Sequence, residues 1–138
     1  RVYRRRGAVL RQLTRDHTVA QALADAGQIR PEEVRTHARR NTLTNYLGGH
    51  RGKIQADVRW TRLEDGDRLL LCSDGLNDMV ADADIAAVLA RGENAQKTVD
   101  ALLEKSLDAG GKDNITLIVA DYAIPPVDAP SAQARPGD

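Results

Sequence analysis

Two aspartates stand where the chain could do metal chemistry. Asp74 follows the apolar run 69–72 after a single serine, and Asp113 lies in the loop GGKDN that leads into the apolar run 115–119. If both runs are strands of one sheet, their carboxylates emerge near the same rim. Carboxylate oxygens are hard donors, which Mg²⁺ and Mn²⁺ prefer together with water. The spacing therefore predicts a Mg²⁺ or Mn²⁺ site at Asp74 and Asp113.

Turn chemistry offers a second interpretation of the same residues. Asp-Gly and Asp-Asn pairs are common at strand ends, because Asp and Asn bond to nearby backbone and Gly adopts positive φ. On spacing alone this interpretation is the commoner one, since a short motif needs structural confirmation. The three histidines lie in polar segments and form no triad, and the one cysteine, Cys72, is expected in the core.

The hydrophobic pattern predicts the elements that would position these residues. Antiparallel strands mixed with helices indicate an α+β fold. The last residues, 123–138, are rich in proline and small side chains, which predicts a disordered tail or a linker. Strands are expected in a hairpin around Arg6-Gly7 and over 53–63, 68–72 and 114–122, and helices over 18–26, 30–40, 82–90 and 94–110.

Composition and charge exclude several classes of function. The 138 residues match one ordinary domain. Lys and Arg total 20 against 20 for Asp and Glu, so no basic surplus argues for a nucleic-acid partner. The longest apolar runs are far shorter than the roughly 20 residues that span a bilayer. We expect a soluble, cytoplasmic protein without a nucleic-acid partner.

Three segments together resemble a known family. GDRLLLCSDGLNDMV and GGKDNITLIVADY resemble the two C-terminal signature motifs of the metal-dependent protein serine/threonine phosphatases of type 2C, the PPM family. Residues 11–49 are similar to the bacterial members, where this region spans a mobile flap beside the active site. The resemblance implies that residues 1–122 are the C-terminal portion of a PPM-type domain, with the flap at about 18–50.

The resemblance implies a fold, a metal centre and a reaction. The fold is an α-β-β-α sandwich of two antiparallel sheets, and the centre is a binuclear Mn or Mg site whose activated water hydrolyses phosphoserine and phosphothreonine. It assigns metal binding to Asp74 and Asp113, and the shaping of their loops to Ser73, Gly75 and Asn114. The implied partners are phosphorylated Ser/Thr proteins, together with a Ser/Thr kinase and its substrates.

The family's N-terminal motifs, DGxGG and GDSR among them, cannot be found in the chain, although Arg1 matches the last residue of GDSR. We therefore expect the missing N-terminal half of the domain to be a further partner, and the isolated chain to be inactive and poorly soluble. Within the flap, His37, Arg39 and Arg40 are candidate substrate-approach residues, or simply an exposed helix end.

Two other functions remain open at this point. A non-catalytic PPM-like remnant would act as a binding or regulatory module, and it needs the flap and the fold but no hydrolysis. A small-anion binding domain would use the GGKDN loop as a nest of backbone N–H groups, which needs only local glycine chemistry.

Overall fold

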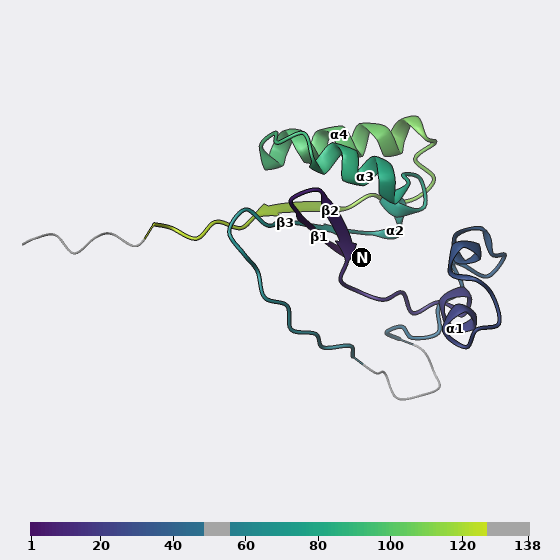
Figure 1. Ribbon diagram of the computed structural model, residues 1–138. Coiled ribbons are helices and arrows are strands. Elements are labelled where there is room, and N and C mark those ends of the chain that lie inside the picture. Colours follow the sequence, from purple (N-terminus) through teal and green to yellow (C-terminus); the bar gives the residue numbers. More distant parts are fainter. Residues whose placement is uncertain (49–55, 127–138) are drawn as a thin grey trace, which may run out of the picture.

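The computed structural model describes residues 1–48 and 56–126. Its centre is a four-stranded antiparallel sheet with the strand order β2-β1-β3-β4. Helices α3 and α4 cover one face of the sheet, and α1 lies in a separate lobe beside it (Figure 1). The strands are β1 (Val2–Arg6), β2 (Val9–Gln12), β3 (Arg68–Cys72) and β4 (Leu117–Asp121). The helices are α1 (Val19–Asp25), the 3-10 helix η1 (Pro31–Thr36), α2 (Asp74–Asn77), α3 (Asp82–Leu89) and α4 (Ala95–Asp108).

The predicted N-terminal hairpin is confirmed. Gly7 turns the chain with a φ of 55°, a value that glycine adopts without steric cost, and Arg6 then pairs with Val9. β1 lies between β2 and β3 in the sheet, and its Tyr3 pairs with Leu70 of β3. The hairpin therefore places the N-terminus of the chain next to the end of β3.

One apolar core lies between the sheet and the helices. Tyr3 and Leu70 from the strands meet Leu76 of α2 and Leu102 of α4, and all four side chains are buried. A fully buried leucine stabilises a fold by about 1.5–3 kcal/mol relative to an exposed one. The core thus fixes α2 against the sheet, directly after the strand that ends at Cys72.

Two ion-pair networks with buried polar groups lie at the start of β3, at the end opposite Cys72. Asp67, fully buried, accepts two hydrogen bonds of 2.7 Å from the Arg6 guanidinium and one of 2.9 Å from the Glu64 N–H. The hydrogen bonds from Arg6 lower the pKa of Asp67 to about 2. Arg68, also buried, pairs with Asp121 and donates to the Thr98 hydroxyl over 3.1 Å. These contacts join β1, β3, β4 and α4.

The predicted strand over 53–63 is wrong for its described part. Residues 56–63 form no strand, and Val58 and Trp60 are 78% and 96% exposed. Residues 53–55 lie outside the described part of the chain. An alternating pattern marks an apolar face, but a strand also needs a hydrogen-bonded neighbour, and this segment runs away from the sheet (Figure 1).

The face of the sheet opposite α3 and α4 is open. Leu71 of β3 and Ile118 of β4 pair with each other there, and they are 38% and 55% exposed. Of the two sheets implied by the family resemblance, the described residues contain this one sheet with helices on one side. The architecture is α+β, as predicted, and one apolar sheet face has no covering layer among the described residues.

Most other predicted elements are confirmed with shifted ends. The Thr18 hydroxyl accepts from the Gln21 N–H at the start of α1, and the Asn94 side chain accepts from the Lys97 N–H at the start of α4. The helix expected over 30–40 is the shorter 3-10 helix η1. Of the predicted tail, residues 127–138 lie outside the described residues.

Candidate metal centre

A strand-turn-helix unit presents Asp74. β3 ends at Cys72, Ser73 precedes the helix, and Asp74 is the first residue of α2. The next three residues of α2 are buried, whereas Asp74 is exposed. A carboxylate in the first turn of a helix is stabilised by the free N–H groups there. Burial of the rest of α2 therefore holds the Asp74 backbone while its carboxylate faces outward.

Ser73 joins the two loops that carry the predicted metal ligands. Its hydroxyl donates to the Asn114 carbonyl and accepts from the Thr116 N–H, each over 3.0 Å. Its own N–H donates to the Thr116 carbonyl over 3.0 Å. Ser73 precedes Asp74, and Asn114 follows Asp113. The structure thus brings the two aspartates to the same end of the sheet through one serine.

Gly75 lets the two loops approach each other. A Cβ atom on Gly75 would lie 2.4 Å from the Asn114 carbonyl oxygen and 3.2 Å from Cγ1 of Ile115, too close for either contact. The carbonyl of Gly75 accepts a buried hydrogen bond of 2.8 Å from the Ser106 hydroxyl of α4. Ser106 is not among the predicted site residues, because its only signal in the sequence is a serine at a core-facing position of a helix.

The donor set at this end of the sheet suits a hard divalent cation. Asp113 is exposed and accepts from the Asn114 N–H over 2.7 Å through one oxygen. Within the described residues, neither Asp74 nor Asp113 forms an ion pair with a basic side chain, so both carboxylates keep free lone pairs. Residues 1–48 and 56–126 contain no group of three or more Asp, Glu, His or Cys side chains placed to hold a metal. The two aspartates therefore fit part of a metal's coordination shell, the remainder coming from water or other groups.

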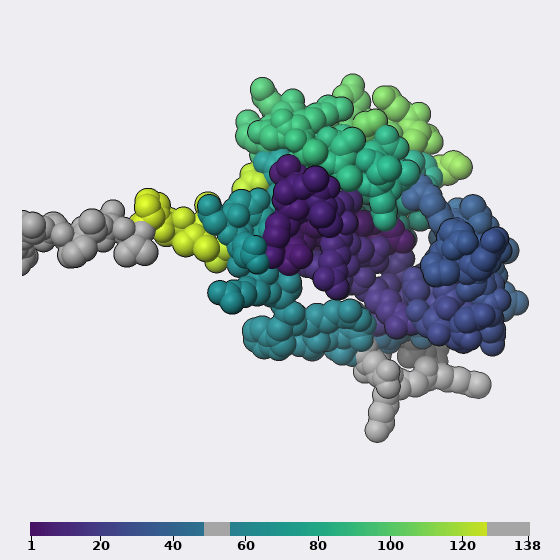
Figure 2. Space-filling view, in the orientation of Figure 1, coloured from purple at the N-terminus to yellow at the C-terminus, as the bar shows by residue number. Residues whose placement is uncertain are grey.

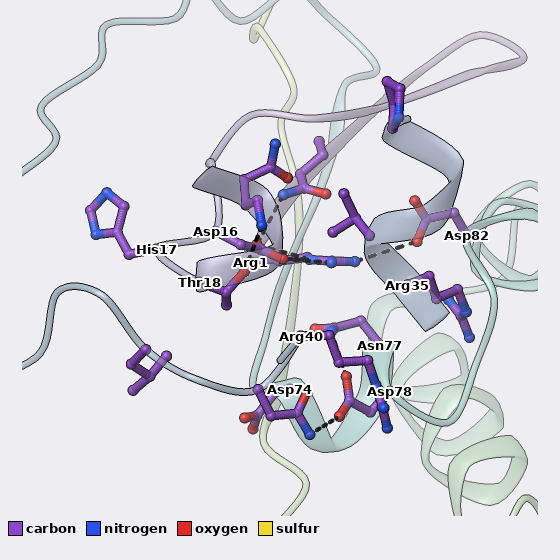
Figure 3. A pocket seen from close by; sticks show the side chains of 16 residues that line it. Arg1, Asp16, His17, Thr18, Arg35, Arg40, Asp74, Asn77, Asp78 and Asp82 are labelled. Atoms are coloured by element: carbon purple, nitrogen blue, oxygen red, sulfur yellow. Dashed lines mark hydrogen bonds and ion pairs between the residues drawn. The ribbon is translucent and has the colours of Figure 1, made fainter. Parts of the chain in front are cut away.

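A cavity of about 460 Å³ lies beside Asp74, between the flap and α2. Asp74 and Asp78 line it from α2, and Arg35 and Arg40 line it from the flap (Figure 3). Of the three candidate substrate-approach residues, Arg40 lines the cavity, whereas His37 and Arg39 lie outside its lining. Arg35 also lines the cavity, and no pattern in the sequence predicts this position.

A cluster of ion pairs and hydrogen bonds lies on another side of this cavity. The Arg1 guanidinium donates to the Asp16 carboxylate at 2.6 to 3.1 Å (Figure 3). It also donates to the Tyr3 hydroxyl at 2.9 Å, and Tyr3 donates to Asp82 at 3.0 Å. Burial alone raises the pKa of Asp16, but the hydrogen bonds and charge of Arg1, the charge of the N-terminus and the hydrogen bond from Gln12 together lower that pKa. The cluster ties the start of β1 to α3 and to the loop that enters the flap.

Known proteins match the chain in sequence and in structure. The family model of stage II sporulation protein E (SpoIIE) matches residues 14–123. The serine/threonine protein phosphatase PstP of Mycobacterium tuberculosis is 40% identical over 136 residues, which are 99% of this chain and 25% of PstP. The PPM Ser-Thr phosphatase MsPP of Mycobacterium smegmatis, solved with cacodylate, is 39% identical with a TM-score of 0.76, over 88% of this chain and 51% of MsPP. The catalytic domain of PstP, solved with two manganese ions, is 37% identical with a TM-score of 0.72, over 89% of this chain and 50% of that domain.

The chain therefore belongs to the SpoIIE/PPM-type family of phosphatases, as the motifs around Asp74 and Asp113 indicated. It spans a quarter of the length of PstP and about half of each of these two solved structures. No helix among the described residues is long and apolar enough to cross a membrane.

Proposed function

We propose that the chain supplies part of the active site of a metal-dependent protein serine/threonine phosphatase. The observation that carries this proposal is the pair of hydrogen bonds made by the Ser73 hydroxyl, which join the strand end before Asp74 to the loop that holds Asp113. The names of the similar proteins support the same reaction class, and one of them was solved with two manganese ions. The substrates are phosphoserine and phosphothreonine in proteins.

Mn²⁺ or Mg²⁺ is the proposed cofactor, with Asp74 and Asp113 as its ligands in this chain. The metal would supply an activated water and positive charge for the phosphate oxygens. Ser73, Gly75 and Asn114 keep the two ligands together through the contacts described above. This arrangement explains why the exposed Asp74 carboxylate is followed by three buried residues.

The flap would contribute to the approach of the substrate. Arg35 and Arg40 line the cavity beside Asp74, and neither has an ion-pair partner within the described ranges. Free guanidinium groups attract phosphoproteins and form charge-assisted hydrogen bonds with phosphate. His37 and Arg39 would act only on the outer surface of the flap.

Because the chain spans about half of the solved phosphatase structures, the proposed activity requires the rest of the domain. That part would cover the open sheet face around Leu71 and Ile118, and it would add further metal ligands. We place the assembled phosphatase in the cytoplasm, where it would act on the products of a Ser/Thr kinase.

The test joins this chain with the part of the PstP catalytic domain that it does not match. Phosphate release from a phosphothreonine peptide is measured with Mn²⁺, after the two pieces have been shown to co-elute. We expect release that needs both pieces and the metal, and that Asp74→Asn abolishes. A co-eluting complex without any release contradicts the proposal.

A non-catalytic binding module is the second candidate function. One observation favours it: residues 1–48 and 56–126 contain no cluster of three side chains placed to hold a metal. A module of this kind would bind phosphoproteins through Arg35 and Arg40 without hydrolysing them. Binding of a phosphothreonine peptide by the assembled domain, with no release of phosphate, identifies it.

A further inference from the structure

The described part of the predicted flap, residues 18–48, forms a lobe in which backbone contacts join the start of the segment to residues 42 and 43. The name flap refers to these residues from here on. Thr18 forms an isolated β-bridge with Leu43, and the Val19 N–H donates to the Thr42 carbonyl over 2.9 Å. The two ends of the flap are therefore joined to each other, and α1 and η1 lie between them. Figure 2 shows this lobe, in blue, beside the body that carries α2 and α3.

One hydrogen bond runs from this lobe to the helix that presents Asp74. The Asn41 side-chain amide donates to the Asp78 carboxylate over 3.1 Å. Asp78 is the C-terminal cap of α2, and its N–H donates to the Asp74 carbonyl over 2.8 Å. A single turn of helix therefore connects the contact with the flap to the candidate metal ligand.

The same bond borders the cavity. Asn41 and Asp78 both line it, from the flap and from α2 respectively, and Asp74 lies beside Asp78 (Figure 3). Separation of Asn41 from Asp78 would open the cavity on the side of the candidate metal centre. Arg1 and Asp16 line another part of the cavity, and their ion pair of 2.6 Å involves no residue of the flap.

We propose that Asp78 is a positioning residue, which holds the flap over the cavity by accepting the hydrogen bond from Asn41. The bond sets the place of Arg40, the residue before Asn41, relative to Asp74. The consequence for substrate binding rests on the proposed phosphatase function, whereas the hydrogen bond and its effect on the flap do not.

Four variants separate the hydrogen bond from the negative charge. Asp78→Ala and Asn41→Ala each remove the bond. Asp78→Asn removes the charge but keeps a carbonyl oxygen that accepts from Asn41. Asp108→Ala is the matched control, because Asp108 is an exposed aspartate at the end of α4 and forms no hydrogen bond or ion pair with the flap within the described residues.

Amide hydrogen exchange of the chain itself tests the proposal. We expect the amides of Val19 and Thr44, which donate to the carbonyls of Thr42 and His17, to exchange about fivefold faster in Asp78→Ala and in Asn41→Ala, the factor for loss of one ordinary hydrogen bond. The double variant should exchange no faster than either single one, and Asp78→Asn and Asp108→Ala should match the unmodified chain. Equal exchange in Asp78→Ala and the unmodified chain, or equal acceleration by Asp78→Asn, overturns the proposal.

Two further measurements complete this test. The amides of β1 and β3 report on the body, and if Asp78→Ala loosens them, Asn41→Ala carries the test alone. In the phosphatase assembled with the PstP segment, Asp78→Ala should raise the KM for a phosphothreonine peptide about fivefold and lower kcat by less than about twofold. An inactive assembly counts against the proposed function, while the exchange result still decides the role of Asp78.

Discussion

Replacement of Gly75 by alanine should separate the two loops of the candidate metal centre. The new Cβ atom would lie 2.4 Å from the Asn114 carbonyl oxygen and 3.0 Å from its carbonyl carbon. Both atoms belong to the backbone of Asn114, so the movement of a flexible side chain cannot relieve the clash. The backbone of the loop that holds Asp113 and Asn114 must then shift away from α2.

The expected magnitude combines two opposing terms. Overpacking of a well-packed site costs typically about 1–3 kcal/mol. Alanine also gains up to about 1 kcal/mol over glycine, because Gly75 lies within a helix and has an ordinary negative φ. The free energy of unfolding should therefore fall by about 1–2 kcal/mol, which lowers Tm by roughly 3–8 °C.

Thermal unfolding and Mn²⁺ binding are the two assays for this variant. We expect Gly75→Ala to lower Tm and also to weaken Mn²⁺ binding, since its steric effect falls on the ligand loop. Ser73→Ala is the matched control: it breaks the hydrogen bonds to Asn114 and Thr116 without adding bulk. A Gly75→Ala protein as stable as the original, with unchanged Mn²⁺ affinity, would refute this explanation of the glycine.

The remaining predictions concern the body of the protein. Because the pKa of Asp67 is depressed to about 2, its ion pair with Arg6 stabilises the fold above about pH 4 and is lost as the pH falls towards 2. Asp67→Asn should therefore lower stability by roughly 1–3 kcal/mol at pH 7, with the difference from the original protein shrinking between pH 4 and pH 2 in denaturant titrations. Thr98→Val removes the hydroxyl that accepts from buried Arg68 and should cost about 1–3 kcal/mol in the same titration, whereas an unchanged midpoint would show that water replaces it. The isolated chain, with Trp60 96% exposed, should self-associate in sedimentation velocity, and the PstP segment should suppress this association.

The sequence predicted the parts of the site that depend on short-range signals. A run of four apolar residues before Ser73 indicates a buried strand, so the place of Asp74 at its end followed from the chain itself. The caps Thr18 and Asn94 are likewise local, because each bonds to an N–H three residues away. The motifs around Asp74 and Asp113 also identified the family, which the comparisons confirmed.

The parts that could not be predicted depend on contacts between distant residues. The bond between Asn41 and Asp78 joins residues 37 positions apart, and both are of types that usually face solvent. Ser106 is a polar residue in the buried stripe of α4, and the hydrophobic pattern that predicts such a stripe marks only its apolar positions. The strand expected over 53–63 failed for a related reason, since the alternating pattern says nothing about which chain lies beside it.

Mn²⁺ binding by the assembled phosphatase domain tests the central claim most directly. The manganese spectrum in electron paramagnetic resonance gives the affinity for the original protein, for Asp74→Asn and Asp113→Asn, and for the control Asp100→Asn, an exposed position of α4 close to Thr98, which contacts Arg68 at the other end of β3. We predict that Asp74→Asn and Asp113→Asn each weaken binding at least about tenfold, whereas Asp100→Asn leaves the affinity unchanged. Equal affinity in all four proteins would contradict the assignment of the metal ligands.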